Sequence, residues 1–149
     1  VDLLPLAQEA AENLRAAAEA KNVSIIVSGE NAPVTGVRRL LYEIAYNLCD
    51  NAIKYNADGG SVDVRVGAEG GSACLTVRDT GIGIPPEHQS RIFERFYRVD
   101  KSHSKMTGGT GLGLSIVKHG AALHGAALTL DSTLNVGTRI TLTFPKNKK

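Results

Sequence analysis

Alternation of apolar and polar residues predicts five β-strands along the chain. In each segment apolar side chains recur at every second position, the period at which strand residues return to the same face of a sheet. The residues Glu69-Gly70-Gly71 separate the second segment from the third and predict a hairpin turn. The predicted strands are residues 23–27, 61–68, 72–79, 127–132 and 137–144.

Helical periodicity predicts three helices, over residues 6–20, 37–55 and 112–123. The first is rich in Ala and Glu, and Pro5 stands near its first turn, where proline is tolerated. The second has an apolar face whose residues recur three or four positions apart. That face consists of Leu41, Ile44, Ala45, Leu48 and Ala52. Residues 97–111 are polar and predict a mobile loop before the third helix.

The order of these elements predicts an α+β fold. Helices are interspersed with hairpin-connected strands, and we expect the helices to pack on one face of the sheet. A length of 149 residues with 42% hydrophobic content fits one globular domain over residues 1–149. We expect flexible ends at residues 1–4 and 146–149.

Charge and cysteine content restrict the function classes. The formal net charge is +2, from 17 basic and 15 acidic residues, so it gives no support to nucleic-acid or membrane-surface binding. Cys49 and Cys74 lie in apolar periodic segments without metal-ligand spacing, which favours buried, reduced thiols and a cytosolic compartment. No apolar run approaches the roughly 20 residues that cross a bilayer. The missing initiator Met suggests a fragment or processed chain and is compatible with a membrane-anchored parent.

A row of polar residues follows one face of the second predicted helix. The row consists of Glu43, Asn47, Asn51 and Lys54. Their spacings place all of them within an arc of about 80° around the helix axis. At the border with the apolar face, the amide oxygen of Asn51 can reach a partly enclosed hard cation and Lys54 can meet phosphate oxygens. The alternative is a solvated face, since polar residues occupy the outer side of any amphipathic helix.

A carboxylate ends the core-facing row of the third predicted strand. Asp79 has the same parity as Leu75 and Val77, so its burial requires hydrogen-bond donors from the backbone or from a bound molecule. The exocyclic amino group of a purine is a suitable donor. Gly81 and Gly83 permit close approach and positive φ beneath a flat base. The alternative is an Asp-Thr-Gly turn capped by its own backbone.

Glycines open the third predicted helix. Gly109, Gly111 and Gly113 stand where free amides and the positive end of the helix dipole favour phosphate. The segment lacks the Gly-Lys-Ser/Thr ending of a Walker A loop and the preceding strand of a dinucleotide fingerprint. Basic residues in the loop before it either close over a triphosphate or remain solvated. They are Arg98, Lys101 and Lys105.

Taken in chain order, four motifs resemble the GHKL ATPase and kinase superfamily, and specifically the catalytic ATP-binding domain of bacterial sensor histidine kinases. The resemblance covers nearly the whole chain, from Val1 to Pro145. A closing Gly137-Thr138 is similar to the last glycine element of the family. The four motifs are NLCDNAIKY at 47–55, DTGIGIP at 79–85, RIFERFYRVD at 91–100 and GGTGLGLSIVKH at 108–119.

The resemblance implies a two-layer α/β sandwich of the Bergerat type, in which about three helices cover one face of a mixed, mostly antiparallel sheet and a mobile lid closes over ATP. It implies that Asn51 coordinates Mg²⁺ and that Asp79 reads the adenine amino group. Phe93 and Phe96 would anchor the lid, although two phenylalanines three apart are otherwise plain core residues. The implied ATP-binding residues are Asn47, Asn51, Lys54, Tyr55, Asp79, Gly81, Gly83, Ile84, Phe93, Phe96, Arg98, Lys101, Gly109, Thr110, Gly111, Leu112, Gly113, Leu114 and Thr138.

One position separates phosphoryl transfer from hydrolysis within the superfamily. Its hydrolysing members carry a water-activating Glu four residues before the magnesium Asn, where this chain has Asn47. An amide cannot act as a general base at neutral pH, so the resemblance favours transfer. The catalytic candidates are Asn47 and, one turn earlier, Glu43, which either polarises an acceptor or a water or is a plain exposed carboxylate.

The resemblance also implies partners outside this chain. The phosphoacceptor histidine of the family lies on a separate dimeric helical hairpin, and none of the four histidines here has such a context. We expect a monomeric fragment that binds MgATP, transfers the γ-phosphoryl group to that hairpin and serves a response regulator. The parent would be anchored in the bacterial inner membrane with this domain in the cytoplasm. Alternatives are a serine kinase of the anti-sigma-factor type and a nucleotide-binding regulatory module without transferase activity.

The closing glycine element departs from the family pattern at one position. The family commonly has another glycine two residues before Gly137, where this chain has Asn135. Asn is the next most tolerant residue of left-handed backbone, so we expect the turn to persist.

Overall fold

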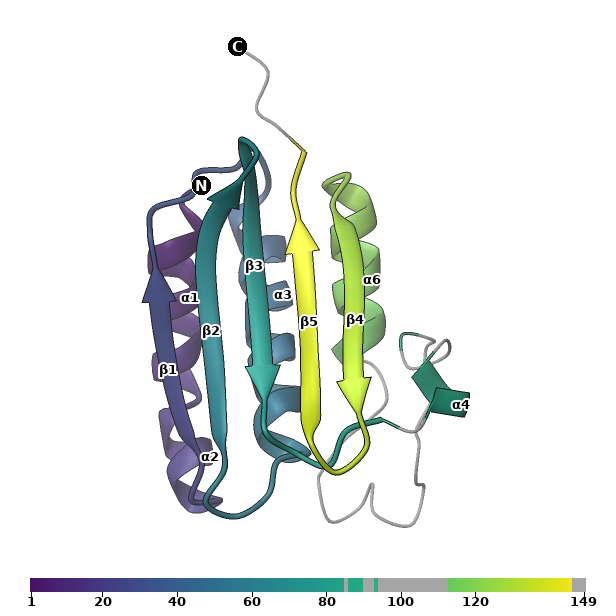
Figure 1. Cartoon of the computed structure of the whole chain (residues 1–149). Coiled ribbons are helices and arrows are strands. Elements are labelled where there is room, and N and C mark those ends of the chain that lie inside the picture. The colour runs from purple at the N-terminus through teal and green to yellow at the C-terminus, as the bar shows by residue number, and fades with distance from the viewer. Residues whose placement is uncertain (85, 90–92, 94–112, 146–149) are drawn as a thin grey trace.

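A single five-stranded sheet organises the computed structural model, which describes residues 1–84, 86–89, 93 and 113–145 (Figure 1). The strand order is β1-β2-β3-β5-β4; β1 pairs with β2 in parallel and all other neighbours are antiparallel. The strands are β1 (Ser24–Gly29), β2 (Ser61–Glu69), β3 (Ser72–Asp79), β4 (Ala127–Thr133) and β5 (Gly137–Thr143). The mixed, mostly antiparallel sheet expected from the sequence is confirmed.

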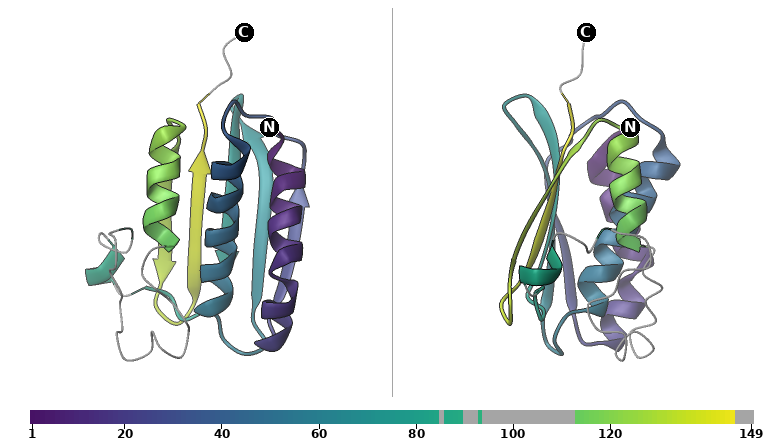
Figure 2. Two further views of the ribbon diagram at one scale, coloured as in Figure 1. Left: turned by 180° about the vertical axis from the view of Figure 1, so that it is seen from behind. Right: turned by 90° about the vertical axis from the view of Figure 1, so that its right-hand side faces the viewer.

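Helices cover one face of the sheet, which makes a two-layer molecule (Figure 2). The helix α3 lies between α1 and α6 and packs against both. The described helices are α1 (Leu3–Asn13), α2 (Arg15–Ala20), α3 (Arg38–Lys54), α4 (Pro86–Gln89) and α6 (Gly113–Leu123). In this described part of the chain, none has the length and apolar character required to span a membrane. The predicted α+β class is confirmed.

The N-terminal helical segment differs from the single helix predicted over residues 6–20. The structure divides it at Leu14, whose backbone leaves the helical region, into α1 and α2. The first of these begins at Leu3 because the Asp2 side chain accepts a hydrogen bond from the backbone N–H of Leu4. An aspartate before the first helical residue is a favourable N-cap, since it satisfies a backbone donor that has no partner within the helix.

Contacts at the very start of the chain do not fit the flexible end expected at residues 1–4. The Val1 amine donates to the Val34 carbonyl at 3.0 Å, and Asp2 Oδ1 accepts a second hydrogen bond, from Ala32 N, at 3.1 Å. Leu3 is fully buried in the core. The flexible C-terminal end expected at residues 146–149 lies outside the described residues.

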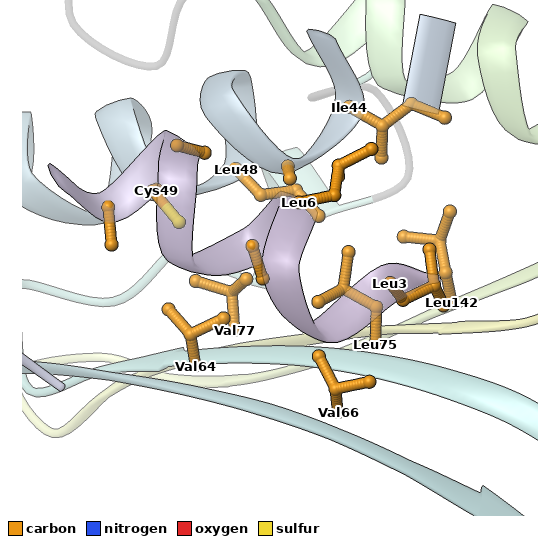
Figure 3. Packing of buried hydrophobic residues seen from close by; sticks show 14 of the residues in the cluster. Leu3, Leu6, Ile44, Leu48, Cys49, Val64, Val66, Leu75, Val77 and Leu142 are labelled. Carbon is orange, nitrogen blue, oxygen red and sulfur yellow. The ribbon is translucent and has the colours of Figure 1, made fainter. Parts of the chain in front are cut away.

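The core fills the space between the sheet and the helices (Figure 3). From the sheet, alternate residues of β2 and β3 point toward α1 and α3, among them Val64, Val66 and Leu75. The whole predicted apolar face of α3 is buried, namely Leu41, Ile44, Ala45, Leu48 and Ala52. Removing a large apolar side chain from water stabilises a fold by roughly 1.5–3 kcal/mol, so this layer contact holds the sheet and α3 together.

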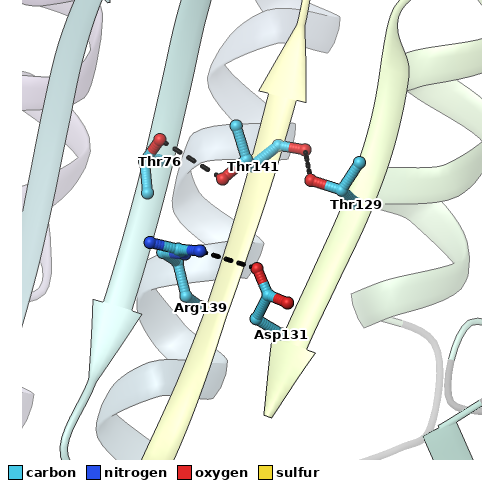
Figure 4. A network of polar contacts seen from close by, with 5 residues as sticks. All are labelled: Thr76, Thr129, Asp131, Arg139 and Thr141. Atoms are coloured by element: carbon cyan, nitrogen blue, oxygen red, sulfur yellow. Dashed lines mark hydrogen bonds and ion pairs between the residues drawn. The ribbon is translucent and has the colours of Figure 1, made fainter.

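The opposite face of the sheet is polar (Figure 4). Arg139 forms an exposed ion pair with Asp131 at 2.7 Å, and the hydroxyl of Thr76 donates to that of Thr141. Cys74 belongs to this face because strand parity places it opposite the buried Leu75, and it is half-buried. The sequence predicted that both thiols are buried. This prediction is wrong for Cys74 and confirmed for Cys49 on α3, which is fully buried.

Two predicted turns are confirmed by the backbone. Gly70 and Gly71 have φ values of +59° and +86° and join β2 to β3 as a tight hairpin, the conformation that glycine favours. Asn135 has φ of +66° in the turn between β4 and β5, so it takes the left-handed backbone conformation expected of it.

The two thiols are predicted to differ in reactivity. Burial, followed by the negative charge of Asp50, raises the pKa of the Cys49 thiol to about 12, so almost no nucleophilic thiolate forms there at neutral pH. In the native protein an aromatic disulfide reagent should react promptly with Cys74 only. Cys74→Ser should remove that reaction, and denaturant should restore reactivity to Cys49. Prompt modification of two thiols in the native wild-type protein would contradict this packing.

Candidate functional site

The ends of two helices and one strand meet at the candidate site. At the far end of the helical layer, the Val37 N–H before α3 donates to Nε2 of His124, just after α6, at 3.1 Å. In the middle, Gly120 lets α6 approach α3, since a Cβ there would lie 2.8 Å from Ile44 Cδ1. The two helices therefore run antiparallel, and α6 begins beside the end of α3. The C-terminal end of β3 lies at this same end of the molecule (Figure 1).

The polar row of α3 is half-buried along its outer side. Asn47 Nδ2 donates to the Glu43 carbonyl at 2.7 Å, which orients the Asn47 amide along the helix. Lys54 Nζ lies 2.9 Å from the carboxylate of Asp50, a partner that the spacing argument did not include. The Asn51 side chain makes no hydrogen bond to another described residue. The row thus keeps an amide oxygen and an ammonium group close together at the end of the helix.

A cation from another segment caps the end of α3. The ammonium group of Lys21, which follows α2, donates to the backbone carbonyl of Lys54. Positive charge is favourable at a helix C-terminus, where carbonyl groups lack helical partners. Burial lowers the pKa of Lys21 from its ordinary value. The next residue after the helix, Tyr55, leaves 37% of its surface exposed beside this cap.

Asp79 ends the inward-facing row of β3, as its parity predicts. Its Oδ1 atom accepts hydrogen bonds from the backbone N–H of Gly81 at 2.9 Å and of Thr138 at 3.2 Å. Its Oδ2 atom accepts none from a described residue. The backbone cap and the free acceptor, which the sequence left as alternatives, therefore occur together on the two oxygens of one carboxylate.

The surroundings of Asp79 oppose its ionisation. Burial raises the pKa of this carboxyl above its ordinary 3.8, and the hydrogen bonds from Gly81 and Thr138 act in the opposite direction. Burial raises the pKa because it removes water from the charged form, and it is the larger of the two effects, so the net shift is upward. A hydrogen-bond donor that reaches Oδ2 would stabilise the ionised carboxylate and lower its pKa.

Three glycines are required here by close contacts within the protein. A Cβ at Gly81 would lie 2.3 Å from the Tyr55 carbonyl oxygen, and one at Gly83, where φ is +72°, would lie 2.2 Å from the backbone carbonyl oxygen of Thr133. A Cβ at Gly137 would lie 2.1 Å from the backbone carbonyl oxygen of Asp79. Contact with neighbouring backbone already requires Gly81 and Gly83 to lack side chains, and their part in a base pocket stays a prediction. Gly137 allows β5 to begin against Asp79 and so brings the Thr138 N–H into range.

Thr138 and Ile84 share a polar neighbour that the motifs did not reveal. The hydroxyl of Ser132 lies 2.9 Å from that of Thr138 and accepts the N–H of Ile84 at 2.8 Å. Gln89 of α4 donates to the Ile84 carbonyl at 2.8 Å. The sequence could have indicated Ser132 by strand parity, because Ser132 follows Leu128 and Leu130 on the helix-facing side of β4.

The remaining predicted residues belong to the lid and the glycine loop. Phe93 and Leu114 are partly buried and pack against the core, and Gly113 begins α6. The other predicted residues of these motifs lie outside the described residues. They are Phe96, Arg98, Lys101, Gly109, Thr110, Gly111 and Leu112.

Comparison with known proteins decides the family. The model for histidine kinase-, DNA gyrase B- and HSP90-like ATPases matches residues 36–148, which is most of the chain. The chain belongs to this ATPase family. Membership implies that the domain binds ATP, and the site at the ends of α3, β3 and α6 is the part of this ATPase domain that carries the expected nucleotide-binding motifs.

Individual relatives of this ATPase domain are sensor kinases. It is 41% identical to the sensor-like histidine kinase SenX3 of Mycolicibacterium smegmatis over 147 residues, which cover 98% of this chain and 38% of SenX3. The solved mycobacterial sensor histidine kinase MprB matches with a TM-score of 0.85 and 32% identity, over 97% of this chain and 96% of that one. The resemblance to histidine kinase catalytic domains is confirmed, and the chain spans well under half of the length of SenX3.

A third similarity is to a solved complex. Full-length ShkA bound to AMPPNP matches the ATPase domain with a TM-score of 0.83 and 30% identity, over 97% of this chain and 30% of ShkA.

Asp79→Asn is predicted to raise the thermal stability of the nucleotide-free ATPase domain at neutral pH. Burial raises the folded-state pKa of Asp79, so the folded protein binds more protons than the unfolded chain between about pH 3.8 and that raised value. Stability therefore falls as pH rises through this window, and a neutral amide avoids the loss. Thermal unfolding of both proteins from about pH 3 to about pH 8 should show a difference in midpoint that grows with pH and then levels off.

The exposed Asp131 provides the matched control. Asp131→Asn changes the same groups on the open face of the sheet, where the side chain is 68% exposed, and should show no such growth in the stabilising direction. A lower midpoint for Asp79→Asn than for wild type at neutral pH would mean that the two backbone hydrogen bonds outweigh the cost of burial.

Proposed function

We propose that this chain is the ATP-binding catalytic domain of a two-component sensor histidine kinase. In this proposal it binds MgATP and presents the γ-phosphoryl group to a histidine on a separate dimeric helical hairpin of the parent protein. The observation that carries the proposal is the placement of Asp79. Its Oδ1 atom is fixed by two backbone donors, and its Oδ2 atom is left as an acceptor at the end of the molecule where α3 presents Asn51 and Lys54.

Adenine is the base that suits such an acceptor. An ionised carboxylate only accepts hydrogen bonds, and the exocyclic amino group of adenine is a donor. A purine with a carbonyl oxygen at that position would place acceptor against acceptor. Tyr55, partly exposed next to the segment that follows Asp79, would border the base, and the hydroxyl of Thr138 would support it from β5. The AMPPNP complex of ShkA supports the same assignment, since AMPPNP is an adenine nucleotide analogue.

The residues at the end of α3 fit a magnesium ion that arrives with the nucleotide. Magnesium prefers six oxygen ligands and commonly takes only one or two from the protein, with phosphates and waters supplying the rest. Asn51 offers one amide oxygen, and within the described ranges no group of three His, Cys, Asp or Glu side chains could hold a metal by itself. When bound, magnesium would supply charge neutralisation for the phosphates; Asn51 would hold it, with Asn47 nearby.

Phosphoryl transfer depends chiefly on positioning and electrostatic stabilisation. Lys54 would exchange its contact with Asp50 for phosphate oxygens, and the amides at the start of α6 would face the phosphates with the positive end of the helix dipole. Asn47 cannot remove a proton at neutral pH, which favours transfer over hydrolysis. Glu43, one turn before it, would polarise the acceptor. The roles of the lid and glycine-loop residues outside the described ranges stay predictions.

The parent protein extends the proposal beyond this chain. Since the chain spans 38% of SenX3, the hairpin, the sensor and the response regulator would belong to other parts or partners of the parent system. SenX3 and MprB are named as histidine kinases, which favours histidine over serine as the acceptor. We expect the fragment to be monomeric and to lie on the cytoplasmic side of a membrane-anchored parent, where ATP is available.

Asn51→Ala is predicted to remove the magnesium-dependent part of nucleotide binding. Calorimetric titration with AMPPNP, with and without magnesium, should show at least a tenfold gain from the metal in wild type, equal to about 1.4 kcal/mol, and no gain in the variant. Asn13→Ala is the matched control, because Asn13 lies on α1 and donates only to Tyr42 among the described residues. Equal gains in wild type and Asn51→Ala would contradict the metal assignment.

Transfer is tested by adding a dimeric histidine hairpin and radiolabelled ATP. Acid-labile label on the hairpin is the expected result, and it should disappear with Asn51→Ala. Nucleotide binding without transfer to any hairpin would favour the regulatory module, and acid-stable label on a protein serine would favour the serine kinase. Absence of nucleotide binding by the wild-type domain would contradict the proposal altogether.

A further inference from the structure

Within the described part of the chain, Asn56 is the one buried polar residue, with 5% of its surface exposed. It follows α3 by two positions, outside the motif that ends at Tyr55. Its Nδ2 group donates to the Ser61 carbonyl at 2.9 Å, and its Oδ1 atom accepts from Ala57 N at 2.8 Å and from the Thr80 hydroxyl at 3.3 Å. One side chain thus joins the segments after α3, at the start of β2 and after β3.

The contacts of Thr80 close this arrangement. Its hydroxyl accepts the Ser61 N–H at 2.9 Å, and its own N–H donates to the Ser61 carbonyl at 3.2 Å. Gly60 makes room for the cluster, since a Cβ there would lie 2.2 Å from Asn56 Oδ1 and 2.8 Å from the Thr80 hydroxyl. The backbone at Gly60 therefore packs directly against the Asn56 side chain and the Thr80 hydroxyl.

The neighbours of this cluster along the chain are the proposed base-binding residues. Tyr55 precedes Asn56, and its carbonyl accepts the Ile82 N–H at 3.2 Å. Asp79 precedes Thr80. Asn56 and Thr80 therefore tie the end of α3 to the segment that follows Asp79, so the side chain of Asn56 contributes to where that carboxylate stands relative to Tyr55.

We propose that Asn56 is a positioning residue for adenine recognition, which acts through Thr80 on Asp79 without touching the nucleotide. The inference rests on the proposed function, in which Asp79 accepts a hydrogen bond from the adenine amino group. Loss of Asn56 leaves buried polar groups without partners and removes one of the connections between the end of α3 and the segment that follows Asp79. Asn51 is less affected, because it lies inside α3, where helical hydrogen bonds and packing set its position.

This difference gives a signature that general destabilisation does not produce. Asn56→Ala should weaken ADP binding by about tenfold, and by the same factor with and without magnesium, because the defect lies at the base. A residue that acts at the phosphates, such as Asn51, should lose affinity only when magnesium is present. Calorimetric titration of ADP under both conditions measures the two factors directly.

Thr80 supplies a matched pair of variants. Thr80→Val replaces the hydroxyl with a methyl group of similar size and should weaken ADP binding in both conditions, whereas Thr80→Ser keeps the hydroxyl and should bind nearly as wild type. The double variant Asn56→Ala with Thr80→Val should bind no worse than Asn56→Ala alone, since both changes break the same connection. This pair also tests the inference if Asn56→Ala does not fold.

Val66→Ala controls for lost stability. Val66 is fully buried in β2, five positions from Ser61 toward the other end of the strand, so its truncation creates a core cavity away from the site. It should lower the unfolding temperature and leave ADP affinity unchanged. Wild-type affinity in Asn56→Ala, equal affinities in Thr80→Val and Thr80→Ser, or a loss shared by Val66→Ala would overturn the inference. A wild-type domain that does not bind ADP would instead overturn the proposed function on which the inference rests.

Discussion

The hydrogen bonds that Asp79 receives from Gly81 and Thr138 are the constraint on which the candidate site depends. They occur because β3 and β5 pair with Asp79 opposite Thr138, and because Gly137 has no side chain to keep β5 away. A buried carboxylate without donors would be costly. The pairing of β3 with β5 supplies the Thr138 donor to Asp79, and that hydrogen bond in turn supports the pairing. In the proposed function, the register of this central strand pair is therefore a condition for recognising a base.

The helical layer contributes the other part of the candidate site, and its position does not depend on the pairing of β3 with β5. The α3 helix is held to the sheet by its apolar face and to α6 by the close approach at Gly120, so its polar row is carried on a rigid element. The antiparallel arrangement then brings the start of α6 to the end of that row. In the proposed function, base recognition from the sheet and phosphate recognition from the helices therefore meet at one end of the molecule. The small cluster around Asn56 connects the end of α3 to the segment after β3, and this connection is the basis of the positioning role proposed for Asn56.

Patterns along the chain predicted the elements well because each depends on short-range periodicity. The five strands, the apolar face of α3 and the parity of Asp79 all follow from it, and the left-handed turn at Asn135 follows from local backbone preference. The cap at Asp2 is a local hydrogen bond to Leu4, so an aspartate before an apolar run could have been read as a helix start. The break at Leu14 interrupts a run of good helix formers, and helix propensity contains no signal for it. Asn56 escaped notice because its partners come from three separate segments. The exposure of Cys74 could have been read from strand parity.

The most direct test of the central claim compares two nucleotides on the wild-type domain. ADP and inosine diphosphate differ at the position of the exocyclic group, which is an amino donor in the first and a carbonyl acceptor in the second. If Asp79 Oδ2 reads that group, ADP should bind at least about a hundredfold more tightly, since the exchange loses a hydrogen bond to a charged acceptor and sets two acceptors against each other. Equal affinities would show that the Asp79 carboxylate does not contact the base.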